Sequence, residues 1–496
     1  MPWWTSIGYF LVGLYALALL YILIFCLSQL HLLLLYSRHR IKHPREQLRP
    51  DPPAEWPPVT VQLPIFNEIY VVERLIRNIM LLDYPKERLE VQVLDDSNDD
   101  TVEIAARIVR EYQDQGYRIQ HIRRANRQGF KAGALKYGLE IASGAFIAIF
   151  DADFLPTADF LRRTIPWFSD PQVGVVQTRW EHINASYSLL TALQAFQLNV
   201  HFSVEQSGRQ QGHYFLQFNG TGGIWRRETI LDAGGWQPDT LTEDLDLSYR
   251  AQLNGWRIQY LEELGSPAEL PAEMNGLKSQ QHRWMKGGAE TARKILPNVW
   301  RSGLSLNKKI QATLHLMASG IFVFVFIIGV FSVPVLFLTR TLGINTYYFA
   351  WFLTGMLAII AVYFAGNVTT GWSGQSWGRK LIKFLVLFPL FLSLSMGLSL
   401  HNSVAVIQGW LGKKSAFVRT PKFNIRNLSD SFRHHRYLAQ SISWLTVFEG
   451  ILSLYFLLAI GLGIYYGLTS FVIFHAMLAF GYGMIFYYSL RHLEAK

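Results

Sequence analysis

The carboxylates best placed to do chemistry lie in Asp151-Ala152-Asp153, directly after the apolar stretch 145–150. That stretch is rich in Ile and Phe and predicts a short buried strand. In an extended chain residues i and i+2 point the same way, so both carboxylates can converge on one hard divalent cation, Mg²⁺ or Mn²⁺. Such an ion keeps coordination positions open for a substrate diphosphate. The alternative interpretation is an acidic loop after a buried strand.

A second acidic pair, Asp95 and Asp96, follows the apolar stretch 89–94, which also predicts a strand. At the carboxyl edge of an α/β sheet these side chains could accept hydrogen bonds from a nucleobase or a ribose. They could equally cap the helix that the sequence predicts after them. Lys131 is a candidate cation for a leaving phosphate, and the alternative is an ordinary surface lysine.

Two further polar motifs occur later in the same region. In Thr242-Glu243-Asp244 one carboxylate could deprotonate a hydroxyl nucleophile, whereas the alternative is a solvated helix start. In Gln280-Gln281-His282-Arg283-Trp284 an Arg and a Trp beside amides could clamp a diphosphate and stack on a sugar. An amphipathic helix lying on a membrane would have the same composition, and both interpretations can hold together.

The segment 59–297, which contains these motifs, has the character of a water-soluble α/β domain. Its strand and helix patterns alternate, and this alternation predicts parallel pairing in a doubly wound sheet. Strands are expected at 59–63, 89–94, 117–122 and 145–150, and helices over 68–82 and from Lys131. Neither a Gly-x-Gly-x-x-Gly turn nor a Walker lysine loop is present. A nucleotide would therefore be held by carboxylates and a metal.

The rest of the chain has a composition typical of membrane proteins. The 496 residues are 50% hydrophobic and only 17% charged. The net charge is +10, and many Lys and Arg residues flank apolar runs, which favours an anionic membrane surface over nucleic acid as the partner. The single cysteine, Cys26, lies in an apolar run, which excludes a disulfide within the chain and a cysteine-based metal site.

The apolar runs predict where the chain crosses the membrane. Residues 1–36 are expected to form a retained N-terminal transmembrane helix, and the basic residues after it place the next part in the cytoplasm. A basic and Pro-rich linker, 37–58, leads into the domain of 59–297. Residues 298–496 are expected to form a C-terminal membrane domain. Its predicted spans lie near 310–338, 347–367, 442–466 and 469–490.

Two segments of this C-terminal domain are expected to behave differently. The run 380–411 is interrupted by Pro389 and Gly397, which predicts an interfacial or re-entrant helix. The stretch 412–437 is rich in Lys and Arg and is expected to be a cytoplasmic loop.

Taken together and in order, the motifs resemble those of membrane-bound family 2 glycosyltransferases, the cellulose synthase superfamily. Two more motifs carry this resemblance, Pro64-Ile65-Phe66-Asn67-Glu68 and the segment 218–223 (FNGTGG). The amino-acid sequences of 218–223 and 281–284 are most similar to those of mannan-synthase-like and bacterial cellulose-synthase-like members. The resemblance covers 59–297 and implies an α/β fold of the GT-A (Rossmann-like) type, in a cytoplasmic domain inserted between transmembrane α-helices.

The resemblance also implies residue roles. Asp244 would be the catalytic base toward the acceptor, and Asp151 and Asp153 would bind Mg²⁺ or Mn²⁺. Phe66 stands where many members have Tyr. Its ring could still stack on the nucleobase of the donor, but it cannot form the hydrogen bond of a phenol. The implied donor-binding residues are Phe66, Glu68, Asp95, Asp96, Lys131, Asp151, Gln280, Arg283 and Trp284. The implied acceptor or gating residues are Asn219, Gly220, Thr221, Trp284, Phe417, Thr420 and Lys422.

The gating residues come in part from a loop. Phe417-Val418-Arg419-Thr420-Pro421-Lys422 resembles the Phe-x-Val-Thr-x-Lys gating loop of cellulose synthases, with Arg419 in place of the usual Val. Such a loop could close over a donor with an apolar wedge, a hydroxyl and a cation. The alternative is a polybasic segment that holds anionic lipid.

The sequence therefore predicts an inverting enzyme of the inner or plasma membrane, multi-pass, with a cytoplasmic catalytic domain. It would transfer a hexose from a nucleotide-sugar of the UDP-glucose or GDP-mannose type to a growing β-glycan, processively. A glycolipid synthase that makes a single transfer to a lipid acceptor is the alternative. A membrane transporter with a regulatory nucleotide-binding domain is disfavoured because the soluble domain lacks a P-loop. Membrane lipids, and no nucleic acid, are the other expected partners.

Overall fold

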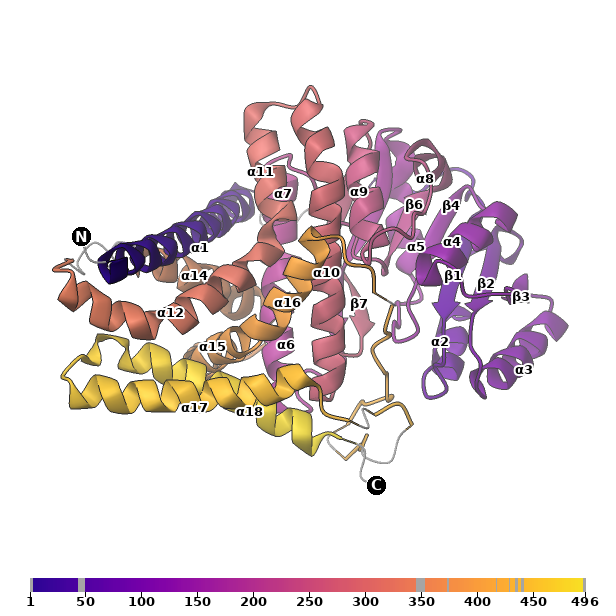
Figure 1. The fold of residues 1–496 in the computed structure, drawn as a ribbon. Coiled ribbons are helices and arrows are strands. Elements are labelled where there is room, and N and C mark those ends of the chain that lie inside the picture. Colours follow the sequence, from indigo (N-terminus) through magenta and orange to yellow (C-terminus); the bar gives the residue numbers. More distant parts are fainter. Residues whose placement is uncertain are drawn as a thin grey trace.

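The architecture combines a sheet domain with a body of apolar helices (Figure 1). The computed structural model describes residues 3–42, 50–344, 353–372, 374–415, 417–427, 429–432, 436–438 and 441–493. Figure 1 shows the sheet on the right and the apolar helices on the left, with the long helix α10 (Met274–Arg301) upright between them. Helix α10 carries the Gln280–Trp284 motif, so this motif lies where the two parts meet.

In the described residues the sheet has seven strands in the order β3-β2-β1-β4-β6-β5-β7. Strands β1 to β4 pair in parallel, as the sequence predicts. Strand β6, which the sequence did not predict, runs antiparallel to both β4 and β5, so the sheet is mixed. The strands are β1 (Val59–Ile65), β2 (Leu89–Asp95), β3 (Ile119–Ile122), β4 (Phe146–Ile149), β5 (Val173–His182), β6 (Gly223–Arg226) and β7 (Arg257–Ala268).

The reversal of β6 follows from the path of the chain after β5. Helices α6 (Leu189–Val200) and α7 (Gln206–Gln211) leave the sheet and contact the apolar helices, α6 against α14 (Leu353–Phe364) and α7 against α1 (Trp3–Lys42). The chain then returns to the edge at which β5 ended, and a strand that starts from this edge runs antiparallel to β5. The excursion joins the sheet domain to the membrane part.

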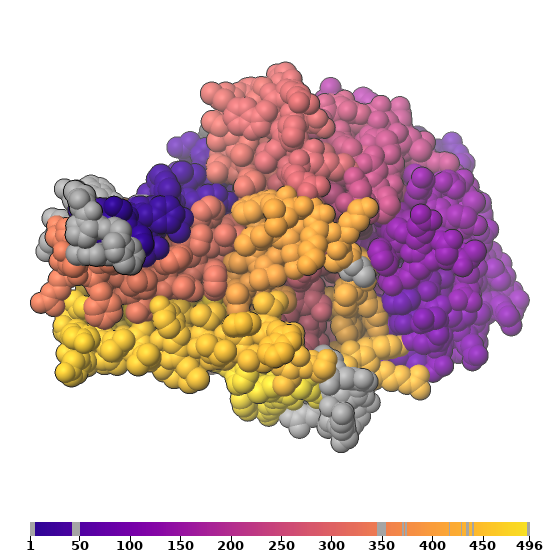
Figure 2. All heavy atoms as spheres, in the orientation of Figure 1, coloured from indigo at the N-terminus to yellow at the C-terminus, as the bar shows by residue number. Residues whose placement is uncertain are grey.

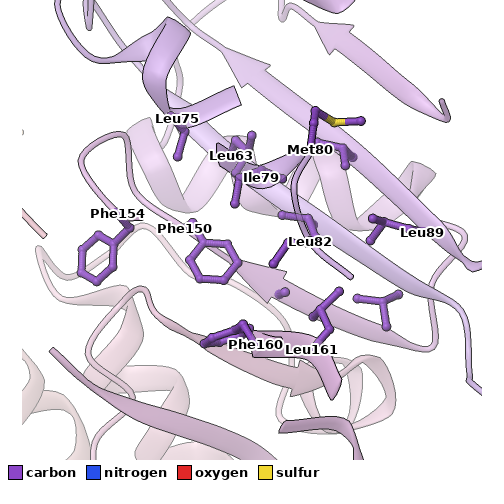
Figure 3. Packing of buried hydrophobic residues seen from close by; sticks show 14 of the residues in the cluster. Leu63, Leu75, Ile79, Met80, Leu82, Leu89, Phe150, Phe154, Phe160 and Leu161 are labelled. Carbon is purple, nitrogen blue, oxygen red and sulfur yellow. The ribbon is translucent and has the colours of Figure 1, made fainter. Parts of the chain in front are cut away.

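The sheet is buried on both faces, and every residue of β2 and β4 is buried. One core packs Leu63, Phe150 and Phe160 beneath α2 and α3 (Figure 3). The other packs Leu135 and Trp225 beneath α4 and α9. Continuous apolar strands are typical of sheets with helices on both faces. The covering helices are α2 (Val72–Ile79), α3 (Thr101–Asp114), α4 (Phe130–Ile141), α5 (Phe160–Thr164), α8 (Arg227–Asp232) and α9 (Glu243–Leu253).

Strand register brings the acidic motifs to one edge. Ile65 at the end of β1 pairs with Asp95 at the end of β2, and Gln62 of β1 pairs with Ile149 at the end of β4. The carboxyl ends of these three parallel strands therefore lie side by side. The polar residues that follow each strand emerge together, as the rule for open α/β sheets predicts.

Five helices in the described part of the chain are long and apolar enough to cross a membrane: 5–41, 318–341, 377–397, 444–465 and 469–491. The expected span near 347–367 lies partly outside the described residues, and the described part is a shorter apolar helix over 354–369. The remaining helices of this body are α11 (Leu306–Leu316), α12 (Ile321–Thr341), α15 (Trp377–Gly397), α16 (Ser399–Trp410), α17 (Trp444–Tyr465) and α18 (Val472–Arg491).

The run 380–411 consists of two helices, α15 and α16, separated at Leu398. Near the start of α15, Phe384 packs against Phe196 of α6. At the end of α16, the backbone at Gly409 lies against the backbone at Lys286 of α10. Both ends thus contact helices that flank the sheet domain, and the re-entrant arrangement stays a prediction. Because α15 alone has the length of a spanning helix, the number of crossings stays a prediction.

The close contact between α15 and α18 generates a testable prediction. A Cβ added at Gly481 would lie 1.9 Å from the carbonyl oxygen of Ser393, so Gly481→Val should force the two helices apart. Overpacking of this kind costs about 1–3 kcal/mol or more, and we expect a lower melting temperature in detergent. Gly461→Val on α17 is the matched control, because among the described atoms a Cβ there meets nothing within 4 Å. Equal melting temperatures for the two variants would contradict the packing assigned to α15 and α18.

Candidate active site

A cavity of about 170 Å³ lies at the carboxyl edge of β1 and β4, against α10. Its wall contains the predicted residues Phe66, Glu68, Asp96, Lys131, Asp151, Asp153, Asn219, Gly220, Asp244, Gln280, Arg283, Trp284, Phe417, Thr420 and Lys422. These residues come from the sheet edge, from α4, α9 and α10, and from the loop after α16. Tertiary folding therefore brings together motifs that are hundreds of residues apart.

Two predicted residues, Asp95 and Thr221, lie behind the wall. One oxygen of Asp95 accepts the Ser97 N–H at 2.8 Å, and the other lies 2.8 Å from Nε2 of His121. Asp95 is not among the residues that line the cavity, and its contact with a nucleoside stays a prediction. Thr221 is fully buried, and its hydroxyl accepts the N–H of Asp151 at 2.8 Å. Thr221 thereby positions Asp151, which does face the cavity.

Asp151 is held by a lysine from α4. The Lys131 ammonium donates to Oδ1 of Asp151 at 2.5 Å and to the carbonyl oxygen of Gly220 at 2.9 Å. Burial by itself would lower the pKa of Lys131, but the charge of Asp151, with Glu243 and Asp244 nearby, raises that pKa above its ordinary value. Lys131 is therefore a permanent cation inside the cavity and not a surface lysine.

Asp244 lies in the first turn of α9, and its carboxylate faces Gly220. A Cβ added at Gly220 would lie 3.0 Å from Oδ2 of Asp244. Burial, together with the negative charge of neighbouring Glu243, raises the pKa of Asp244 to about 7. A carboxylate with a pKa near the working pH is suited to accept a proton from a hydroxyl group.

Helix α10 supplies Gln280, Arg283 and Trp284, whose spacing of three and four residues puts them on one face. The guanidinium of Arg283 lies 4.8 Å from the ring centre of Phe417 in the loop. The ring of Phe417 in turn stacks on Phe130 at 5.8 Å. The amide, cation and indole of α10 thus face the carboxylates across the cavity.

Two arginines near the start of α4 contact the residues predicted to hold a nucleoside. The guanidinium of Arg127 lies 3.3 Å from the ring centre of Phe66, a cation–π contact. Arg124 forms an ion pair with Asp96, with Nε 3.0 Å from Oδ1. The sequence analysis assigned neither arginine a role. Their one detectable signal was the basic cluster just before Lys131.

The loop after α16 lies over the cavity and is held by ion pairs. Arg419 pairs with Glu68 at 3.1 Å, and Lys422 pairs with Asp153 at 2.7 Å. Burial raises the pKa of Glu68 to about 8, which the positive charge of Arg419 opposes. Figure 1 shows this orange segment crossing from α16 toward the sheet domain, and Figure 2 shows orange atoms packed against the purple surface. The sequence predicted the loop but not these partners.

The carboxylates Asp151 and Asp153 fit a divalent cation. Each already binds a lysine ammonium, so this end of the cavity attracts positive charge. Over the described ranges no three His, Cys, Asp or Glu side chains are close enough to hold a metal ion by themselves. Mg²⁺ and similar ions are commonly bound by one or two carboxylates plus substrate phosphates, which is the donor set available here.

His182 and Trp180 also line the cavity, and the sequence analysis missed both. They lie two residues apart near the end of β5, so strand alternation points them to the same side. The strand itself was not predicted. Had β5 been predicted, the alternation of its side chains between the two faces of the sheet would have identified both residues.

Comparisons with known proteins agree with this geometry. Residues 57–287 match the family described as glycosyltransferase like family 2. The probable glucomannan 4-beta-mannosyltransferase 4 of Oryza sativa subsp. japonica is 41% identical over 276 residues, 54% of this chain and 50% of the relative. Glucomannan 4-beta-mannosyltransferase 2 of Arabidopsis thaliana is 42% identical over 263 residues, 52% and 48% of the two chains. The chain thus spans about half the length of these curated relatives.

A solved structure supports the fold. It is a mannosyltransferase from Pyrobaculum calidifontis in complex with GDP-Man and Mn2+, with a TM-score of 0.53 and 20% sequence identity. The match covers 81% of this chain and 100% of the other. At this identity the likeness shows the fold alone, which is the expected GT-A type.

Gly220 provides a prediction for the cavity. It has a φ of +78°, in the left-handed region, and a Cβ there would press on Asp244. Gly220→Ala should cost about 1–2 kcal/mol in backbone strain and should also displace the carboxylate, so turnover falls at least tenfold. Gly116→Ala is the control, since it has a φ of +79° and, among described atoms, no neighbour within 4 Å.

Nucleoside diphosphate release and thermal melting should be measured for both variants. We expect similar losses of stability and a loss of turnover confined to Gly220→Ala. Equal turnover of the two variants would contradict the prediction that a side chain at Gly220 disturbs the carboxylate of Asp244.

Proposed function

We propose that this chain, in which residues 57–287 form a domain of the glycosyltransferase-like family 2, is a membrane-bound inverting mannosyltransferase that extends a β-glycan. The donor would be a nucleotide-sugar, and GDP-mannose is the one we propose. The names of the plant relatives support mannose and a β product. The ligand named with the solved neighbour supports GDP as the nucleotide.

One observation carries this proposal. A single cavity between the sheet domain and α10 collects a carboxylate with a raised pKa, a carboxylate pair suited to a metal, and an Arg and a Trp. This combination meets the needs of glycosyl transfer from a diphosphate donor: a base for the acceptor, countercharge for the leaving group and an aromatic ring for a sugar.

In the proposed reaction the acceptor hydroxyl oxygen attacks the anomeric carbon of the donor sugar. Its proton passes to the carboxylate of Asp244. The bond from the anomeric carbon to the diphosphate oxygen breaks, and its electron pair leaves with the nucleoside diphosphate. Lys131 and Arg283 lie in the cavity wall and offset that negative charge. Mg²⁺ or Mn²⁺ bound at Asp151 and Asp153 would neutralise the diphosphate further.

We further propose that the catalytic domain faces the cytoplasm of the inner or plasma membrane and that synthesis is processive. Basic residues after α1 and in 412–437 support this orientation. The position of Trp284 and of the loop 417–422 in one cavity wall, directly beside the apolar helices, supports handing a growing chain to the membrane part. The alternative is a lipid-linked acceptor. It would also reach the cavity from the side of the apolar helices.

The role of Asp244 leads to a pH prediction. A base must be unprotonated to act, so with a pKa of about 7 the kcat/KM should fall as the pH drops below about 7. Asp244→Asn should lose ~10²–10⁴-fold in turnover, and its residual rate should lack this acidic limb. GDP binding should change little. Equal losses of GDP binding and turnover would indicate a structural role for Asp244 instead.

The proposed activity itself is tested with the purified full chain in detergent. Release of nucleoside diphosphate is measured with GDP-mannose and with UDP-glucose, each with Mn²⁺ or Mg²⁺ and a mannan oligosaccharide primer. We expect GDP release and β-linked chains of many sugars. A product that stops at one sugar on a lipid would support the glycolipid synthase, and no release from any donor would contradict both.

A further inference from the structure

The ammonium of Lys422 lies in a site built for a cation. Its Nζ donates to Oδ2 of Asp153 at 2.7 Å and to the carbonyl oxygen of Glu269 at 2.7 Å. The side chains of Lys422 and Asp153 are only 11% and 7% exposed. A carboxylate oxygen and a backbone carbonyl oxygen are also the ligands that hard divalent cations take. The lysine therefore marks where a cation binds.

His182 ends β5, the strand next to β7, and it pairs in register with Ala268 of β7. The next residue, Glu269, donates its N–H to Oδ2 of Asp153 at 3.1 Å. His182 therefore lies one strand away from Glu269, whose backbone also contacts Asp153, and all three residues line the same cavity.

The imidazole of His182 has unused binding capacity. Within the described part of the chain, neither ring nitrogen has a hydrogen-bond partner, and both are shielded from solvent. Buried polar atoms without a partner are rare and call for an explanation. A neutral imidazole keeps a lone pair on one ring nitrogen, which is what a metal ligand requires.

We propose that Asp153, the carbonyl oxygen of Glu269 and His182 form the protein side of a divalent cation site, which the Lys422 ammonium fills in this structure. Asp151, held by Lys131, remains the second carboxylate at the edge of the site. The cation and the ammonium compete for the same oxygens, so loading the cation requires Lys422 to leave. The released lysine is then free to reach a diphosphate.

The size of the cavity supports this competition. With the loop in place the cavity measures about 170 Å³. Typical ligand sites measure roughly 300–1,000 Å³, so the position of the loop leaves too little room for a nucleotide-sugar. Withdrawal of Lys422 from Asp153 would open the pyrophosphate end of the cavity. It would expose the cation ligands at the same time.

A nitrogen ligand also predicts which metal binds. Mn²⁺ shares the oxygen ligands of Mg²⁺, but as a first-row transition ion it accepts an added imidazole more readily than Mg²⁺, which gives up its water ligands reluctantly. The site should therefore bind Mn²⁺ more tightly than Mg²⁺, and substitution of His182 should remove this preference. The role of this cation in catalysis rests on the proposed function. Its binding does not, because the affinity for the metal is measured without any donor.

The experiment uses the full chain in detergent and Mn²⁺ alone. The affinity is measured from the EPR signal of free Mn²⁺, and nitrogen ligation is read from the ¹⁴N modulation of the bound ion's spin echo. Lys422→Met removes the competitor and should tighten Mn²⁺ binding at least tenfold, with ¹⁴N modulation present. Lys413→Met, an exposed lysine nearby in the chain, is the control and should leave the affinity unchanged.

A second substitution tests the histidine. On the Lys422→Met background, His182→Phe should abolish the ¹⁴N modulation and reduce the preference for Mn²⁺ over Mg²⁺. His182→Asn serves if the phenylalanine variant has a lower melting temperature. Unchanged Mn²⁺ affinity in Lys422→Met, or bound Mn²⁺ without nitrogen modulation, would overturn the proposal. These results are independent of the donor screen, so failure of the proposed function and failure of this site can be told apart.

Discussion

Charge compensation among buried carboxylates is the constraint on which this site depends. Asp151, Asp153, Glu68 and Asp244 share one cavity, and burial there raises the pKa of Glu68 and of Asp244. Positive charge comes from separate parts of the chain, with Lys131 from α4, Arg283 from α10, and Arg419 and Lys422 from the loop. These cations lie on three different elements, so the charges balance only when the sheet domain, α10 and the loop are assembled together.

The same need for assembly explains the contacts between α10 and the membrane helices. Lys278 of α10 pairs with Glu449 of α17 at 2.7 Å, and the two side chains are 6% and 0% exposed. Removing one partner of a buried pair typically costs about 3–5 kcal/mol, so α10 is tied firmly to α17. His401 of α16 lies 3.0 Å from the carbonyl oxygen of Lys278 and fixes the same turn. The helix that carries Arg283 and Trp284 is thereby held at a defined position relative to the apolar body.

The loop after α16 adds further positive charge to this frame. Its residues make ion pairs and ring contacts with the cavity wall and replace the charges that a donor and its metal would bring. An apolar wedge and two cations in one short segment give it affinity for the same carboxylates that serve the donor. Competition between loop and donor follows from their shared chemistry and needs no separate regulatory site.

The sequence by itself determined the parts whose signals are local. Apolar runs that end in carboxylates identified β2 and β4, alternation over 59–63 identified β1, and the composition of 280–284 identified a polar motif with an Arg and a Trp. Strand direction in the second half of the sheet could not be predicted, because it depends on the path of α6 and α7 along the apolar helices. Only the tertiary structure decided that Asp95 turns inward to Ser97 and His121 while Asp96 faces the cavity. It alone brought Lys422 to Asp153 beside His182, because burial and charge pairing act between residues that are close in space but distant in sequence.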